Sequence, residues 1–398
     1  MQEVGFMYLT KDEERIYDGE YGWAKQVSIR ILVKLGDLYG ADRLIPIESA
    51  HISGVAYRTI GDASIEFLKE LANSNAKAAV RATTNPSSID TMNQLFSCLP
   101  RNVIEKQREI INLYETMGIE ITLTCTPYYI RRPAFGSHLS WAESSAVIYA
   151  NSLLNAWTNR EGGPSALASA LVGKTPNYGL HKPENRRASV LVKVEAPLKS
   201  EADYGVLGMY LGEVLGNRIP VISGLRRRDE MCLKQLGAAM ATSGMASMFY
   251  LDENYVGERS FEEEISVDDK SLKASYERLS STIEKPDLVL IGCPHSSPEE
   301  LKIIARYLEG KRVRDDVKLW VCASKYVRRN ADEYVRVIET SGGHVICDTC
   351  AVVTWLRELG VETLVSNSAK TVHYAPLLSK VGASLSSLEE CVKIACGK

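Results

Sequence analysis

The chain has 398 residues, of which 45% are hydrophobic and 24% are charged, and its formal net charge is −3. This is an ordinary globular composition, long enough for two or three domains with well-buried cores. The small charge, with no basic run longer than Arg226-Arg227-Arg228, gives no support for binding to nucleic acid, and no apolar stretch reaches the roughly 18 residues typical of a membrane span.

Two helices are expected at the start, over residues 9–19 and 24–40, where apolar residues recur at helical spacing between glycines. Short β-rich runs then alternate with helical stretches. The sequence predicts the next strands at 77–84 and 119–126 and the next helices at 91–99 and 103–118.

The same alternation continues to the C-terminus, interrupted by an acidic stretch at 253–273 that we interpret as a connection leading into a surface helix. The remaining predicted strands are 187–196, 219–224, 246–253, 287–293, 317–325, 343–350 and 362–370. This order is typical of βαβ units. We therefore expect an α/β fold of several doubly wound, mostly parallel-sheet domains around a central cleft, divided at about 1–185, 186–280 and 281–398.

Three cysteines occupy equivalent places in this pattern. Cys125, Cys293 and Cys350 each lie at or just after the carboxyl end of a predicted strand. Ligands of open α/β sheets bind at that edge, where helix starts expose N–H groups that favour thiolates. Three thiolates leave a bound metal with an open position, as a Lewis-acid catalyst requires, whereas four would close the site.

The other cysteines leave alternatives open. Cys322 also ends a predicted strand, so position alone does not separate it from the three. Cys347 and Cys350 form a C-x-x-C pair, which is compatible with a disulfide, a zinc half-site, a redox dithiol or one corner of a larger site. Cys98, Cys232, Cys391 and Cys396 lie on predicted helices, where we expect buried thiols. Because no secretory signal precedes the first helix, we expect a cytoplasmic protein with reduced cysteines.

Loops at the same edge offer candidate contacts for a small anion. Residues 51–56 present backbone N–H groups, and Gly54 allows close approach. Residues 85–88 supply an amide and hydroxyls, although a simple turn also explains them. We interpret residues 140–143 as a capping box, which places Ser144 and Ser145 in the first helical turn.

Several single residues allow two interpretations. Lys370 follows a predicted strand and can pair with a carboxylate or phosphate, or be an ordinary surface lysine. His51 and His295 are more simply hydrogen-bonded loop residues than catalytic ones, and His373 is a proton donor or a helix cap. No dinucleotide-binding or P-loop motif follows a predicted strand, which disfavours a nucleotide-dependent enzyme. A non-catalytic metal-binding scaffold stays open as an alternative.

The elements TCTPY, GCPHSS and DTC, together with WAESSAVIYANSLLNAWTNREGG, AHISGVAYRTIGD and SNSAKTVHYAP, resemble those of the aconitase X family. The resemblance covers essentially the whole chain, and the motifs occur in the family's order. It implies the domain type of the aconitase superfamily and the chemistry of an iron–sulfur hydro-lyase. It also implies an iron–sulfur cluster held by Cys125, Cys293 and Cys350, which leaves Cys347 as a buried strand thiol. We expect a 4Fe-4S cluster, with another nuclearity as the alternative.

The resemblance further implies a two-subunit enzyme. The chain lacks the small swivelling domain of fused family members, so we expect a separate small subunit that carries the catalytic base, a serine, and no certain catalytic residue in this chain. The expected reaction is dehydration of mevalonate 5-phosphate in isoprenoid synthesis, with cis-3-hydroxy-L-proline dehydration as the alternative. The residues expected to contact substrate are Gly54, Val55, Ala56, Asn85, Pro86, Ser144, Ser145 and Lys370.

Overall fold

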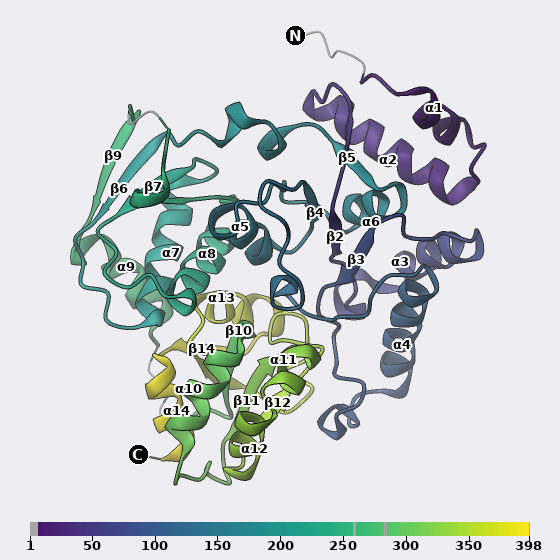
Figure 1. Ribbon diagram of the computed structural model, residues 1–398. Helices are drawn as coiled ribbons and strands as arrows, with labels where there is room; N and C mark the ends of the chain where they lie inside the picture. Colours follow the sequence, from purple (N-terminus) through teal and green to yellow (C-terminus); the bar gives the residue numbers. More distant parts are fainter. Residues whose placement is uncertain (1–6, 258–259, 282, 284, 398) are drawn as a thin grey trace.

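The computed structural model describes residues 7–257, 260–281, 283 and 285–397 (Figure 1). Its strands form four sheets, of which three are parallel throughout and one is an antiparallel pair. The strands in spatial order are β1 (Leu44–Pro46) and β5 (Lys174–Pro176); β3 (Arg81–Thr84), β2 (Ser49–Ile52) and β4 (Leu139–Trp141); β8 (Tyr250–Leu251), β7 (Pro220–Ser223), β6 (Val190–Val194) and β9 (Glu263–Val267); and β12 (His344–Ile346), β11 (Lys318–Ala323), β10 (Leu288–Ser296), β13 (Thr363–Ser366) and β14 (Gly382–Leu385).

Helices separate these strands along the chain and cover the sheets (Figure 1). They are α1 (Lys11–Asp18), α2 (Trp23–Tyr39), α3 (Tyr57–Asn73), α4 (Arg101–Thr116), α5 (Ser144–Leu153), α6 (Gly163–Val172), α7 (Glu201–Leu215), α8 (Glu230–Ser243), α9 (Asp269–Leu279), α10 (Pro298–Leu308), α11 (Lys325–Asn330), α12 (Asp332–Thr340), α13 (Ala369–Tyr374) and α14 (Leu388–Cys396). The expected class, a mixed α/β fold with several parallel sheets, is confirmed.

The strands of the five-stranded sheet are continuous apolar runs because both faces of the sheet are covered. Successive residues of β10 point to opposite faces: Val289 and Ile291 join one apolar cluster, whereas Leu288 and Leu290 join another. A parallel sheet that is covered on both faces has no solvent side, so its strands do not alternate with polar residues. The chain enters this sheet at its central strand, β10, and later returns beside it as β13. Ligands bind at the carboxyl ends of strands next to such a reversal.

Residues 119–126, predicted to be a strand, form only an isolated bridge between Thr83 and Glu120. Leu123 has a positive φ of 44°, which breaks the extended conformation. Side-chain hydroxyls replace the missing ladder: the backbone N–H of Thr84 donates to the Thr122 hydroxyl at 3.0 Å, and the Thr122 N–H donates to the Thr84 hydroxyl at 2.9 Å. The prediction of a strand was therefore wrong, and the segment that carries Cys125 is an irregular loop.

Two other predictions are corrected. The helix expected at 91–99 is only a short 3-10 turn, Gln94–Phe96, so Cys98 lies in an exposed turn rather than in a buried helix. The stretch 253–273 contains strand β9 in addition to the start of α9, because its isoleucine and valine pair with β6 despite the acidic neighbours. Both errors come from judging a segment by its composition.

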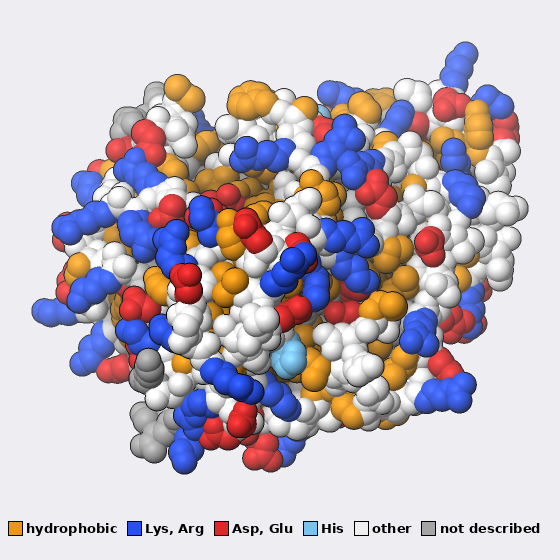
Figure 2. Space-filling view, turned by 60° about the horizontal axis from the view of Figure 1, so that its bottom comes forward, with side chains coloured by type: hydrophobic (Ala, Val, Ile, Leu, Met, Phe, Trp, Pro, Cys, Tyr) orange, Lys and Arg blue, Asp and Glu red, His pale blue; other side chains and the backbone are white. Residues whose placement is uncertain are grey.

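Positive and negative side chains are interspersed across the face shown in Figure 2, in keeping with the small net charge. Among the described residues, no helix is long and apolar enough to cross a membrane.

Candidate functional site

Two parallel sheets meet through their carboxyl edges. The loops after β2, β3 and β4 belong to one sheet, and the loops after β10, β12 and β13 belong to the other. Two contacts join the edges directly: the backbone N–H of Ser87 donates to the carbonyl of Asp348 at 2.8 Å, and the Nζ of Lys370 lies 2.7 Å from the Oε1 of Glu143. Residues that are far apart in the chain therefore line one place.

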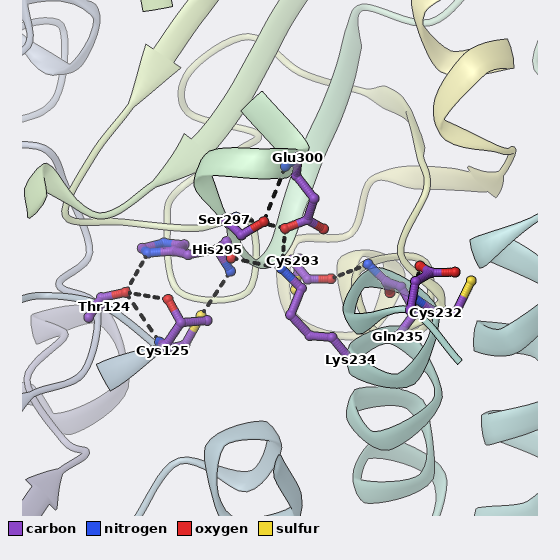
Figure 3. A network of polar contacts seen from close by, with 11 residues as sticks. Thr124, Cys125, Cys232, Lys234, Gln235, Cys293, His295, Ser297 and Glu300 are labelled. Carbon is purple, nitrogen blue, oxygen red and sulfur yellow. Dashed lines mark hydrogen bonds and ion pairs between the residues drawn. The ribbon is translucent and has the colours of Figure 1, made fainter. Parts of the chain in front are cut away.

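Cys125 lies in the irregular loop beside β3, two residues before the short 3-10 helix Pro127–Tyr129. Its thiol is buried and accepts a hydrogen bond from the backbone N–H of His295 at 3.2 Å (Figure 3). A hydrogen bond to sulfur stabilises the thiolate form. The loop of Cys125 is thus tied to the strand that carries Cys293.

Cys293 lies where β10 leaves the regular ladder. The pairing of β10 with β11 shifts register between Ile291 and Ser296, which is a bulge that re-aims the side chains within it. Gly292 permits the bulge, because its φ is 95° and a Cβ there would lie 2.3 Å from the carbonyl oxygen of Cys322. The carbonyl of Cys293 is held by the side-chain amide of Gln235 at 3.2 Å.

Cys350 follows β12 in a turn where Asp348 adopts a positive φ of 64°. Burial and the neighbouring Cys293 raise its pKa to about 12, against the backbone N–H groups of Val352 and Val353, which lower it. Cys347, the other half of the C-x-x-C pair, ends the strand as a separate buried thiol. Cys322 packs with the apolar cluster under the sheet. Both cysteines of the C-x-x-C pair are free thiols in the structure.

The three thiols lie close enough to interact electrostatically, and their surroundings fit a bound cation. Burial raises the pKa of Cys125 well above its usual value, and Glu143 and the thiols of Cys350 and Cys293 raise it further. A metal that coordinates these sulfurs would reverse the shift, because a coordinated thiol gives up its proton. The buried hydroxyls of Ser296 and Thr349 have no hydrogen-bond partner among the described residues, which is expected beside a site that takes a polar group.

The donor set of Cys125, Cys293 and Cys350 is sulfur only, and thiolate is a ligand both of zinc and of iron–sulfur clusters. Within the described part of the chain, no group of three or more His, Cys, Asp or Glu side chains converges tightly enough for one metal ion. One zinc ion draws every thiolate to about 2.3 Å from a single point. The irons of a cluster, in contrast, each take their own cysteine and so accept sulfurs that lie further apart.

Helix α8 supports the Cys293 bulge from the neighbouring domain (Figure 3). The Nζ of Lys234 donates to the carbonyl of His295 at 3.1 Å and pairs with Glu300. Both partners are buried, and Glu300 also caps α10 together with Ser297. Lys234 and Gln235 were not predicted, although a lysine and a glutamine inside the otherwise apolar run CLKQLGAAM were a usable signal.

Lys370 is paired with the carboxylate of Glu143 and is not an ordinary surface lysine. It is buried, donates to Glu143, and lies 3.4 Å from the hydroxyl of Ser144. Burial lowers the pKa of Lys370, but Glu143 and Cys293 raise it by more, so the amine stays charged. Burial raises the pKa of Glu143, but the neighbouring Lys370 lowers it by more, so the carboxylate also stays charged.

The capping box predicted at 140–143 is wrong. Ser140 lies within β4, and Glu143 is itself the N-cap of α5, accepting from the backbone N–H of Ala146 at 2.8 Å and from the hydroxyl of Ser145. The helix starts later because β4 extends to Trp141. Glu143, which we had explained as a cap only, is the buried partner of Lys370.

The remaining predicted contact residues lie at the adjacent strand ends. Gly54 has a φ of 81°, and the buried residues Val55 and Ala56 lead into α3. The side chain of Gln107, which was not predicted, fixes this loop by donating to the carbonyl of Val55 at 2.9 Å. The backbone N–H of Asn85 donates to the carbonyl of Ile52 at 2.9 Å, so the loops after β2 and β3 lie side by side. Pro86 follows in the same buried turn.

Comparison with known proteins shows which family this chain belongs to. Profiles of the first, second and third domains of aconitase X match residues 6–184, 188–277 and 286–397, respectively. The chain belongs to the aconitase X family. A solved member, the holo-form of aconitase X from Thermococcus kodakaraensis, superimposes with a TM-score of 0.92 at 45% identity and covers 98% of this chain and 100% of that chain.

Aconitase X relatives of known name are similar over nearly the full length. The phosphomevalonate dehydratase large subunit of Methanocaldococcus jannaschii is 44% identical, covering 97% of this chain and 100% of the relative. That of Thermococcus kodakarensis is 46% identical over 92% of this chain and 95% of the relative. The cis-3-hydroxy-L-proline dehydratase of Pseudomonas aeruginosa is 32% identical over 98% of this chain but 70% of its own length.

Proposed function

We propose that this chain is the large subunit of an iron–sulfur hydro-lyase that converts (R)-mevalonate 5-phosphate to trans-anhydromevalonate 5-phosphate in isoprenoid synthesis. The observation that carries the proposal is the identity of 42% to 46% with four archaeal phosphomevalonate dehydratase large subunits, each matched over more than nine tenths of both chains. The buried set of thiols, lysine and carboxylate at two facing sheet edges supports it.

Cys125, Cys293 and Cys350 are the proposed ligands of a [4Fe-4S] cluster. Three cysteines leave one iron with an open coordination position, and in that position the cluster supplies a Lewis acid that polarises the leaving hydroxyl without a redox change. The support for these ligands is that each thiol is buried at the carboxyl end of a sheet and interacts with the other two.

Residues of this chain would bind and orient the substrate. The charged amine of Lys370, supported by Glu143, is suited to a substrate carboxylate, because a buried cation pairs strongly with an anion. The loop of Gly54, Val55 and Ala56 presents backbone groups beside it, and the proposed contacts are completed by Asn85, Pro86, Ser144 and Ser145. Val55, Ala56, Ser145 and Lys370 are buried, and exclusion of water around them would strengthen each polar contact.

A second subunit completes the site in this proposal. We assign no base to this chain, and propose that a separate small swivelling subunit provides it. The support is that the similar phosphomevalonate dehydratases are named as large subunits. We also propose that the domains run over about 1–185, 186–280 and 281–398, since the three parallel sheets fall one in each range.

A paired substrate assay tests the proposal. Anaerobically reconstituted chain is incubated with mevalonate 5-phosphate or cis-3-hydroxy-L-proline, each with and without the small subunit, and product is followed by mass spectrometry. We expect loss of water from mevalonate 5-phosphate only when both subunits are present. Turnover of cis-3-hydroxy-L-proline but not of mevalonate 5-phosphate would show that the chain belongs to a hydroxyproline dehydratase. If the complete, cluster-loaded complex turned over neither substrate, the proposal of a hydro-lyase would be contradicted.

A further inference from the structure

His295 lies within the site, but none of the proposed functions of the site uses its side chain. Its imidazole is fully buried, between two of the cysteine loops (Figure 3). The Nδ1 atom lies 2.9 Å from the hydroxyl of Thr124, which precedes Cys125. The Nε2 atom lies 3.0 Å from the carbonyl oxygen of Thr349, which precedes Cys350. The ring thus spans the distance between the two loops.

These contacts define the direction of each hydrogen bond. A carbonyl oxygen only accepts, so Nε2 carries the proton and donates to Thr349. In the neutral ring Nδ1 must then accept from the hydroxyl of Thr124, and that hydroxyl in turn accepts from the backbone N–H of Thr126 at 3.2 Å. Both ring nitrogens are therefore used by the protein, which leaves neither for exchange of a proton with substrate.

The backbone of His295 reaches the remaining parts of the site. Its N–H donates to the sulfur of Cys125 at 3.2 Å, its carbonyl is held by Lys234 at 3.1 Å, and it follows Cys293 by two residues. One residue therefore contacts the Cys125 loop twice and the Cys350 loop once, while it belongs to the Cys293 bulge. The loops themselves have few regular ladder bonds, since the first is irregular and the second turns through a positive φ.

We propose that His295 is a positioning residue that sets the mutual placement of the three cysteine loops and so governs assembly and oxygen stability of the iron–sulfur cluster. The inference rests on the proposed function, because it assumes that the three thiols bind a cluster. Some residues contact the ligands of a metal but not the metal itself, and so hold those ligands in place. Removing such a residue lowers the affinity for the metal by about 10- to 100-fold. A three-cysteine site depends on such residues more than a closed one, because no fourth thiolate holds the metal in place.

The test compares His295→Ala, His295→Gln and Thr124→Val with the wild-type chain. Thr124→Val keeps the side-chain shape and removes only the hydroxyl that donates to the ring. His181→Gln is the matched control, since His181 is also a buried histidine but bonds to His138 at 3.0 Å, apart from the cysteine loops. Each protein is reconstituted without oxygen, and iron, sulfide, the electron paramagnetic resonance spectrum of the reduced cluster and the decay of visible absorbance in air are measured.

We expect His295→Ala and Thr124→Val to lose the cluster in air about 10-fold faster or more, with an altered spectrum, and His181→Gln to match the wild type. His295→Gln, whose amide can still donate to the Thr349 carbonyl, should fall between them. If His295→Ala does not fold, the iron content, spectrum and air stability of Thr124→Val decide whether the inference holds. Wild-type iron, spectrum and air stability in the folded variants would overturn the inference. A wild-type chain that binds no cluster would instead overturn the proposed function.

Discussion

At the scale of single residues, the site is notable for charges that are buried in pairs. Lys370 with Glu143 and Lys234 with Glu300 both have side chains less than a tenth exposed. Removing two charges from water costs several kcal/mol for each ion, and apolar residues of the same shape would stabilise the fold as well or better. Stability alone therefore does not explain these pairs. Their contacts do: one lies beside the thiols and the other holds the bulge that carries Cys293.

Replacing Lys370 by methionine should destabilise the chain by about 3–5 kcal/mol, because Glu143 would be left buried without its counter-charge. The double variant Lys370→Met/Glu143→Gln should recover most of that loss, since the uncompensated charge is gone. Urea unfolding of the metal-free chains measures both effects. Activity in the reconstituted complex should stay low in both variants if the amine binds substrate.

The matched control for this prediction is Lys393→Met. Lys393 pairs with Glu389 on the surface of α14, with both side chains about half exposed. Exposed pairs of this kind contribute about 0–1 kcal/mol. Equal destabilisation by Lys370→Met and Lys393→Met would contradict the view that the Lys370 pair is a buried, mutually dependent unit.

At the scale of elements, the bulge in β10 decides where Cys293 points. Gly292→Ala should destabilise the chain by about 1–3 kcal/mol, because the new Cβ meets a backbone oxygen at 2.3 Å and the backbone has a positive φ of 95°. The same change should reduce the iron bound after reconstitution, since relief of the clash must move Cys293 or its neighbours. Thermal unfolding and iron analysis check the two effects.

Gly310→Ala provides the control for the bulge. Gly310 also has a positive φ, 69°, and lies in the same domain, but a Cβ there meets nothing within 4 Å. It should cost about 1 kcal/mol from backbone strain alone and leave the iron content unchanged. Equal loss of iron in both variants would show that general destabilisation, and not the bulge, governs the placement of Cys293.

The elements that were predicted correctly are those whose pattern has one physical cause. The apolar runs of β10 and β11 indicated strands because a sheet covered on both faces requires them. The start of α10 has a comparable local cause, because Ser297 and Glu300 form a capping box and Pro298 occupies the first helical position. Residues 119–126 looked like a strand by the same rule. The positive φ of Leu123 and the hydroxyl contacts between Thr84 and Thr122, which the apolar pattern does not reveal, make them a loop.

At the scale of the whole molecule, the site exists because two domains bring their sheet edges together. Spacing along the chain indicated that Cys125, Cys293 and Cys350 end strands, but Cys322 satisfied the same criterion. Cys322 packs in an apolar cluster but also interacts electrostatically with the three thiols, and periodicity does not predict which strand ends will face each other. The resemblance to aconitase X supplied that choice. The supporting contacts from Lys234 and Gln107 depend on packing between distant segments, so they became visible only in the structure.

The central claim is that three cysteines from separate loops jointly hold one iron–sulfur cluster. Its most direct test is iron and acid-labile sulfide per chain after anaerobic reconstitution, for the wild type, for Cys125→Ser, Cys293→Ser and Cys350→Ser, and for Cys347→Ser as the matched control. The account predicts a brown wild-type protein with iron and sulfide in equal amounts, impaired loading in each of the three variants and normal loading in Cys347→Ser. A colourless, zinc-loaded wild type, or a Cys347→Ser variant as impaired as Cys350→Ser, would contradict it.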